Sequence, residues 1–183
     1  MSRYMENLIF RVMEKSESTT WDEAVLEWEI VDCEEDDELS LSCVCGKERL
    51  KYLYTIRNAY NGNVLFPIGS LCIKKFERLD LNEEIIAREG MFKLYRAIKT
   101  NTFIELNSEF FSRKLLYALY ERGAFRANQY NNYNGENDFS FMLDMFNKRN
   151  KDSVSAAQQS KINAIIRWSI IPYLETELKF RKN

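Results

Sequence analysis

The spacing of apolar residues changes near residue 80. Before that point, two segments alternate between apolar and polar positions, "EWEIVDC" up to Cys33 and "LKYLYTIRNAY" from Leu50, which is typical of strands in a half-buried sheet. From Asn82 onward, as in "NEEIIAREGMFKLYRAIK", apolar residues recur every three or four positions, which predicts helices. We therefore expect an α+β protein, with a small β-hairpin or sheet unit and helices over residues 1–80 and an all-helical part over residues 81–183.

A β-hairpin is predicted at Asn61-Gly62, between the second alternating segment and "NVLFPIGS". Both residues tolerate the positive φ of a type I′ turn, so the pair is a strong hairpin signal. Pro67 in the returning segment cannot donate a ladder hydrogen bond. We therefore expect it at a sheet edge or at the end of its strand.

Alternation sorts the first hairpin strand into two faces. The aromatic face is expected in the core and holds Leu50, Tyr52, Tyr54 and Ile56. The opposite face is expected in solvent and holds Arg49, Lys51, Leu53, Thr55 and Arg57. The exposed face of the hairpin is thus predicted to be basic.

Serine and threonine residues mark several helix starts. The pattern predicts that Thr20, Ser108 and Ser155 each cap a helix. Gly123 stands where the second of these helices should end. The spacing within residues 3–15 fits a helix or a strand and leaves both open.

The chain has 183 residues and no histidine. Without imidazole, Ser-His and Cys-His catalysis are excluded, as is every zinc site built on histidine. The sequence shows no signal peptide and no apolar run of the roughly 18 residues that a membrane span requires. We therefore expect a cytoplasmic protein whose four cysteines are thiols or metal ligands and not disulfides.

Three cysteines flank the predicted hairpin. Cys43 and Cys45 belong to a CxCG turn, and Cys72 follows the returning strand, where it can reach the same point. Zinc takes four ligands in a tetrahedron, and Cys33 is the remaining candidate for the fourth position. Cysteines are also good small buried residues, so a purely structural role stays open.

Charge is divided unevenly along the chain. Residues 14–38 hold twelve acidic residues and one basic residue, whereas residues 47–78 hold seven basic and two acidic residues. This division is typical of an acidic segment beside a basic nucleic-acid-binding surface, and it also fits two solvated faces that attract each other. The candidate phosphate-binding residues are Arg49, Lys51, Arg57, Lys74, Lys75 and Arg78.

The acidic segment allows two further roles. It can mimic the phosphates of DNA and occupy a basic groove. Its carboxylates can also hold the divalent metal of a nuclease. The candidate metal-binding carboxylates are Asp32, Glu34, Glu35, Asp36 and Asp37. The chain has neither a phosphate-binding glycine loop nor a nucleophile elbow, so it carries no self-sufficient catalytic motif.

Several segments together resemble a group of short proteins of phages and other mobile elements. They are "TTWDEAVLEWEI", "CVCGKERLKYLYTIRN", "NGNVLFPIGSLCIKKF", "RGAFRANQYNNYNGENDFSFMLDMFNKR" and "SAAQQSKINAII". In that group the CxCG and GxxC pieces look like a reduced zinc ribbon, often with a histidine soon after CxCG, where this chain has Lys47. Cys33 matches no motif position of the group.

The resemblance implies an anti-CRISPR protein of the type II class. Such a protein acts in the cytoplasm of a bacterial host on a type II CRISPR effector nuclease and its guide RNA. It blocks guide loading or provokes guide truncation in the presence of the effector, so any RNA cleavage depends on the effector. The alternative is a non-enzymatic accessory protein of a phage or mobile element that binds nucleic acid or mimics DNA.

Overall fold

The computed structural model describes residues 1–179, and its contacts divide the chain into two units, Met1–Ile85 and Ile86–Asn183. The expected α+β class is confirmed, because three strands lie in the first unit and the second is helical. The division falls inside the long helix α4 (Leu79–Lys99). Residues 180–183 of the predicted helical part lie outside the described residues.

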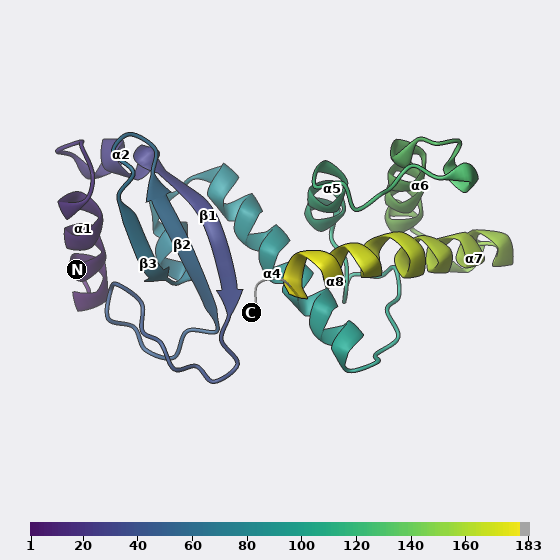
Figure 1. Cartoon of the computed structure of the whole chain (residues 1–183), viewed down its shortest axis with the longest axis horizontal. Helices are drawn as coiled ribbons and strands as arrows, with labels where there is room; N and C mark the ends of the chain where they lie inside the picture. Colours follow the sequence, from purple (N-terminus) through teal and green to yellow (C-terminus); the bar gives the residue numbers. More distant parts are fainter. Residues whose placement is uncertain (180–183) are drawn as a thin grey trace. The chain divides into compact units, whose positions relative to one another are not determined.

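One antiparallel sheet organises the first unit. Its strands are β1 (Trp28–Glu35), β2 (Tyr52–Asn58) and β3 (Val64–Ile68), and β2 lies between the other two (Figure 1). Pro67 is in the edge strand β3, as its missing N–H requires. The sheet core includes Trp28, Tyr54 and Ile56, which are fully buried.

The solvent face of β2 is less open than alternation predicts. Tyr54 and Ile56 are buried as expected, but Leu53 on the opposite face is also only 4% exposed. Arg49 and Lys51 precede the strand, which begins at Tyr52, so they are not part of its basic face. Only Arg57 among the predicted basic residues lies within the strand, where it is exposed.

The predicted hairpin joins β2 to β3, but its turn is not type I′. Gly62 has a φ of +75°, whereas Asn61 does not have the positive φ that this turn type needs at both positions. Side-chain amides organise the loop instead. The Asn58 side-chain oxygen accepts the backbone N–H groups of Tyr60 and Asn61, and the Asn61 side-chain oxygen accepts that of Asn63.

Short helices flank the sheet. Residues 3–14 form α1 (Arg3–Glu14), in which Leu8 and Val12 are buried at helical spacing. The remaining elements of this unit are α2 (Trp21–Ala24), the 3₁₀ segment Val25–Glu27, α3 (Ser70–Ile73) and the 3₁₀ segment Lys74–Phe76. Thr20 precedes α2 as predicted, although its hydroxyl bonds the Glu23 carboxylate and not a backbone N–H.

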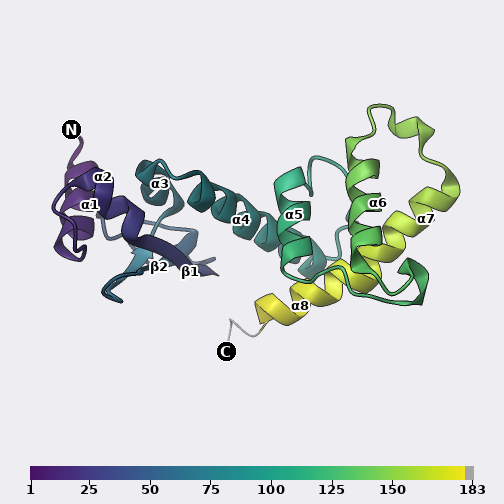
Figure 2. The ribbon, with the colours of Figure 1, turned by 90° about the horizontal axis from the view of Figure 1, so that it is seen from above.

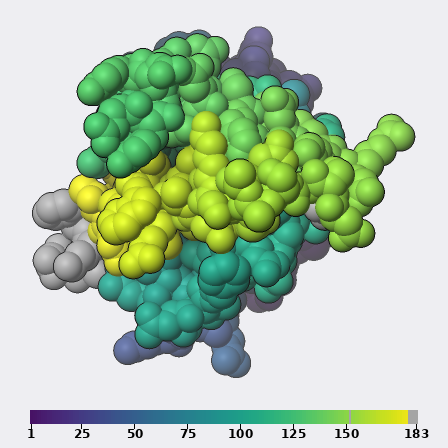
Figure 3. Space-filling view, turned by 90° about the vertical axis from the view of Figure 1, so that its right-hand side faces the viewer, coloured from purple at the N-terminus to yellow at the C-terminus, as the bar shows by residue number. Residues whose placement is uncertain are grey.

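The second unit is built from helices. They are the C-terminal part of α4, α5 (Arg113–Glu121), α6 (Gly135–Asn147), α7 (Ala156–Ile165) and α8 (Ile171–Lys179), with 3₁₀ turns at Gln129–Asn131 and Lys151–Ser153. The α5 and α6 helices pack through aromatic rings, with Tyr120 stacked on Phe139 at 4.4 Å between ring centroids. Figure 3 looks onto this unit and shows the yellow-green surface of α7 and α8 running across it.

One helix cap of this unit differs from the sequence-based expectation. Ser112, and not Ser108, caps α5 by accepting the backbone N–H of Leu115, because Asn107 forms a separate turn with Glu109 and Phe110. The predicted capping by Ser155 is confirmed.

Pro172 does not interrupt the C-terminal helix. A π-helical segment at Ile166–Ile170 leads from α7 into α8, and Figure 2 shows one continuous ribbon there. A proline inside a helix removes one backbone hydrogen bond and crowds the preceding turn. The wider π turn accommodates both effects.

Candidate metal centre

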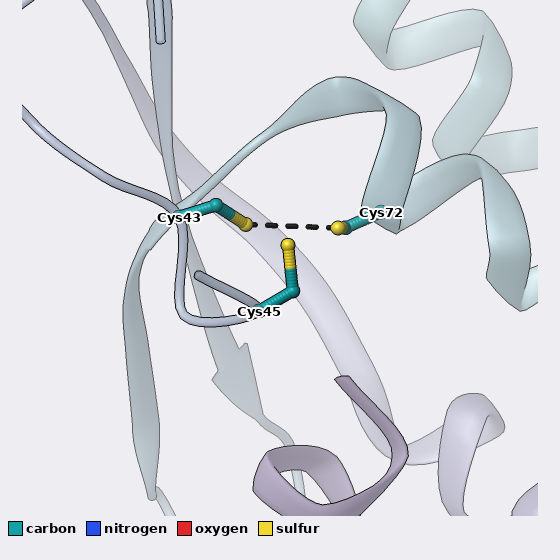
Figure 4. A group of neighbouring side chains, drawn as sticks. All are labelled: Cys43, Cys45 and Cys72. Atoms are coloured by element: carbon teal, nitrogen blue, oxygen red, sulfur yellow. Dashed lines mark hydrogen bonds between the residues drawn. The ribbon is translucent and has the colours of Figure 1, made fainter. Parts of the chain in front are cut away.

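Three thiols converge beside the sheet. The sulfur atoms of Cys43, Cys45 and Cys72 all lie within 4.8 Å of one another (Figure 4). Cys43 and Cys45 come from the loop between β1 and β2, and Cys72 comes from α3. In a tetrahedral site with Zn–S bonds of about 2.3 Å, neighbouring sulfurs are about 3.8 Å apart. The thiol group therefore has the size of a metal site.

A tight turn aims the first two thiols at one point. The Gly46 N–H donates to the Cys43 carbonyl oxygen over 2.7 Å, and the Cys43 N–H donates to the Lys47 carbonyl oxygen over 2.8 Å. Gly46 has a φ of +93°, which only glycine adopts without strain. A further bond, from the Val44 N–H to the Pro67 carbonyl oxygen at 2.9 Å, fastens this turn to β3.

The end of β3 delivers the third thiol. Gly69 precedes α3, and its carbonyl oxygen accepts the backbone N–H of Cys72 over 2.9 Å. The Gly69 N–H in turn donates to the sulfur of Cys43 over 3.3 Å. One residue thus starts the helix that carries Cys72 and stabilises negative charge on Cys43.

Hydrogen bonding separates the pKa values of the three thiols. The pKa of Cys43 falls to about 5, mainly because the Cys72 thiol lies 3.6 Å away and shares a hydrogen bond with it. The backbone N–H groups of Cys45 and Gly69 add to this effect and outweigh burial, which acts in the opposite direction. The shared hydrogen bond raises the pKa of Cys72, and burial raises that of Cys45. These hydrogen bonds therefore favour the thiolate form of Cys43, the form that binds metal.

Cys33 lies outside the thiol group. It is fully buried in β1, opposite Tyr54 of β2, and is not among the ligand atoms that converge. Within residues 1–179, Cys43, Cys45 and Cys72 are the only group of three or more Cys, Asp, Glu or His side chains whose ligand atoms lie this close together. Residues 180–183 have the sequence "FRKN" and contain none of these residue types.

The predicted basic residues divide into three sets. Arg49 and Lys51 line a pocket beside the thiols, together with Lys47. Lys74 and Lys75 are exposed on the turn that follows Cys72. The third set, Arg57 and Arg78, has carboxylate or carbonyl partners within the protein.

Arg78 is the clearest member of that third set. Its guanidinium donates to the carbonyl oxygens of Val25, Leu26 and Trp28 at 3.2, 3.2 and 2.6 Å. It also pairs with Asp80 at 2.5 Å. Arg78 therefore caps the backbone that leads into β1 and offers little to a phosphate. Arg57 lies 4.0 Å from Glu29 across the β1–β2 pair, and both side chains remain more than half exposed.

The acidic segment does not form the alternative carboxylate site. In the described part of the chain, no three of its carboxylates bring an oxygen within 4.8 Å of one another. Asp36 accepts the N–H groups of Glu38 and Ser40 and the Ser40 hydroxyl, which lowers its pKa despite partial burial. Glu35 lies 3.8 Å from Lys51. Part of this segment thus orders its own loop.

Comparison of the chain with protein-family models, with curated proteins and with solved structures found no match. Among the described helices, none combines the length and apolar character that crossing a membrane requires.

Proposed function

We propose that the first unit is a zinc-stabilised RNA-binding module, through which the protein inhibits a type II CRISPR effector by acting on its guide RNA. The observation that carries the proposal is the convergence of the Cys43, Cys45 and Cys72 thiols beside a basic pocket. The proposed metal and the proposed phosphate contacts both depend on that arrangement.

Zinc fits this donor set better than the harder cations do. Thiolates are soft ligands, which favour zinc over magnesium or calcium. The three sulfurs come from two separate segments, the turn after β1 and the helix after β3. A metal ion held by both would fix the long loop 36–51 against the sheet and so fix the basic residues that follow the turn.

Phosphate is the partner group that the surroundings favour. Lys47, Arg49 and Lys51 line one pocket, and Lys74 and Lys75 are exposed after Cys72. Lysine and arginine contacts to phosphates supply affinity for nucleic acid without reading its sequence. A basic surface of this kind suits the backbone of a guide RNA.

The identity of the RNA is supported by the resemblance to mobile-element proteins of the anti-CRISPR type. An accessory protein that binds nucleic acid without an effector is the alternative. A third possible function is that of a DNA mimic. The exposed acidic residues that would supply its charge include Glu29, Glu34, Asp37 and Glu38.

One mixture separates these functions. The protein is incubated with a type II effector and its guide RNA, and the RNA is run on a denaturing gel while the complex is run on a native gel. A shortened guide, or a guide kept out of the effector, supports the proposal. An intact guide in a stable ternary complex that no longer binds target DNA supports the DNA mimic. If the protein stays unbound and the effector remains active, the proposed inhibition is overturned and the accessory role remains.

RNA binding is tested separately with the triple variant Arg49→Ala, Lys51→Ala and Arg57→Ala. Removing three phosphate contacts on single-stranded RNA should reduce the slope of log affinity against log salt by about 2. The control is Lys99→Ala, Arg113→Ala and Arg167→Ala, which removes the same charge from the second unit. Equal affinity of both variants and the wild-type protein at every salt concentration would refute RNA binding by this surface.

A further inference from the structure

A pocket of about 190 Å³ opens beside the thiol group. Its lining residues are Cys43, Lys47, Arg49, Leu50, Lys51, Tyr52, Gly69, Ser70, Leu71 and Cys72. Three of these described residues, Lys47, Arg49 and Lys51, are cations, and the lining contains no Asp or Glu. The pocket is therefore a local concentration of positive charge in a protein whose net charge is −2.

The size of the pocket restricts its occupant. Sites for whole drug-sized ligands usually measure about 300–1,000 Å³. A space of 190 Å³ is smaller than that range and suits a single chemical group with its immediate neighbours. A continuous strand of RNA needs an open groove, whereas the end of a strand can enter a pocket.

The charge of the lining favours a particular kind of phosphate. An internal phosphodiester carries one negative charge, whereas a phosphate monoester carries about 1.5 to 2 at pH 7. Three cations around one small space match the larger charge better. Lysine and arginine also donate several hydrogen bonds each, enough for the three terminal oxygens of a monoester.

Arg49 is one of six described non-glycine residues with a positive φ, and the one that lines the pocket. Its φ is +62°, a left-handed conformation that is uncommon for residues other than glycine. Such a conformation is maintained only where the surrounding structure determines it, and it is frequent at binding sites. Here it places Arg49 in the pocket lining between Lys47 and Lys51.

We infer that this pocket binds the terminal phosphate monoester of an RNA strand, with Lys47, Arg49 and Lys51 as its ligands. The inference rests on the proposed RNA-binding function and names the chemical group that the site selects. Lys51 also lies 3.8 Å from the buried carboxylate of Glu35, which offsets part of its charge, so Lys47 and Arg49 supply most of the uncompensated charge. Lys47 and Arg49 are exposed at the pocket and are therefore accessible to a ligand from solution.

The test compares RNA ends on the full-length protein loaded with zinc. Four versions of one short single-stranded RNA carry a 5′-phosphate, a 5′-hydroxyl, a 3′-phosphate or a 3′-hydroxyl, with the fluorophore on the opposite end. Fluorescence anisotropy at one ionic strength gives each affinity. A phosphorylated end should bind about tenfold more tightly than the matching hydroxyl end, a difference that charge-assisted hydrogen bonds supply. Whether the 5′ or the 3′ pair shows the difference identifies the end.

Variants place the preference in the pocket. In Lys47→Ala, Arg49→Ala and Lys51→Ala combined, the ratio of phosphate to hydroxyl affinity should fall toward 1. In Arg57→Ala, Lys74→Ala and Lys75→Ala combined, the total affinity should fall while the ratio is kept, because these residues do not line the pocket. Circular dichroism and zinc content of both variants verify that they are folded and loaded.

Each result has a distinct meaning. Equal affinities of the wild-type protein for phosphate and hydroxyl ends overturn the pocket assignment and leave the proposed RNA binding intact. A preference that survives in the pocket variant also overturns it, because the selecting residues then lie elsewhere. Absence of binding to all four RNAs refutes the proposed function itself, together with this inference.

Discussion

The side-chain amide of Asn7 donates a hydrogen bond to the carbonyl oxygen of Cys45 over 3.0 Å. Asn7 belongs to α1, whereas Cys45 belongs to the turn after β1, 38 residues later. The first helix is therefore connected directly to the turn that carries two of the three thiols.

Removing this bond should weaken metal binding without removing a ligand. Groups that orient metal ligands typically change metal affinity by about 10- to 100-fold when mutated. Because Asn7 orients the peptide of Cys45 and not its sulfur, we expect Asn7→Ala to lower zinc affinity by about tenfold, the lower end of that range. Competition with a chromophoric chelator measures the affinity.

The matched control is Glu6→Ala, an exposed neighbour on the same helix. It should bind zinc as the wild-type protein does. If Asn7→Ala and Glu6→Ala have the same zinc affinity, the connection between α1 and the turn has no role in the site.

Loss of a single thiol should abolish stable metal binding. We expect the wild-type protein to bind about one zinc ion per chain, and Cys43→Ser, Cys45→Ser and Cys72→Ser each to bind none at the same free zinc concentration. Cys33→Ala should keep its zinc, because Cys33 lies outside the thiol group. Elemental analysis after gel filtration gives the metal content.

Zinc should also stabilise the fold. A ligand that binds only the folded state raises the free energy of unfolding by about 4 kcal/mol when its free concentration is 1,000 times its dissociation constant. Adding chelator should therefore lower the melting temperature of Cys33→Ala but leave that of Cys43→Ser unchanged. Equal responses of the two variants to chelator would exclude the three-thiol site.

The features that sequence predicted are those with a local chemical cause. Glycine at position 46 permits the bend after Cys45, and the change in apolar spacing separates strands from helices. The hairpin brings Cys72 back beside Cys43, so the sequence alone indicated the three thiols as a group.

The features that sequence did not predict depend on distant parts of the chain. Arg78 follows a basic stretch and looks like a phosphate ligand, but its carbonyl partners are 50 to 53 residues earlier. Leu53 is buried although alternation places it in solvent, because alternation describes one strand and not what covers the sheet. The competition between Ser108 and Ser112 was decided by the Asn107 turn, which takes the backbone N–H groups next to Ser108.

Replacing Arg78 should affect folding and not RNA affinity. Its guanidinium makes charge-assisted hydrogen bonds to three backbone carbonyls, and only 19% of its side chain is exposed. We expect Arg78→Ala to lower the free energy of unfolding by about 2 kcal/mol. Lys75→Ala, an exposed neighbour, should change it by less than about 0.5 kcal/mol.

Urea unfolding of the zinc-loaded variants measures both effects. RNA affinity is measured by anisotropy well below the unfolding midpoint. If Arg78→Ala is as stable as the wild-type protein but binds RNA more weakly, Arg78 is a phosphate-binding residue after all.

Glu27 should make stability depend on pH in the acidic range. Its carboxylate is buried at the end of the 3₁₀ segment and accepts the backbone N–H groups of Glu17 and Ser18 at 2.9 and 2.7 Å, as well as the Asn58 amide. Burial acts to raise its pKa, but these hydrogen bonds outweigh burial and lower the pKa from 4.5 to about 2.

Because the folded pKa lies below the unfolded value, the ionised carboxylate stabilises the protein above pH 4.5, and this stabilisation is lost as the pH falls toward 2. Glu27→Gln lacks the charge at every pH, so it should melt at a lower temperature than the wild-type protein near pH 7. The gap between the two melting temperatures should narrow steadily below pH 4.5. Both proteins are compared in the background Cys43→Ser, so that loss of zinc in acid does not contribute. If the gap between the two melting temperatures stays constant from pH 7 to about pH 3, ionisation of Glu27 does not stabilise the folded protein.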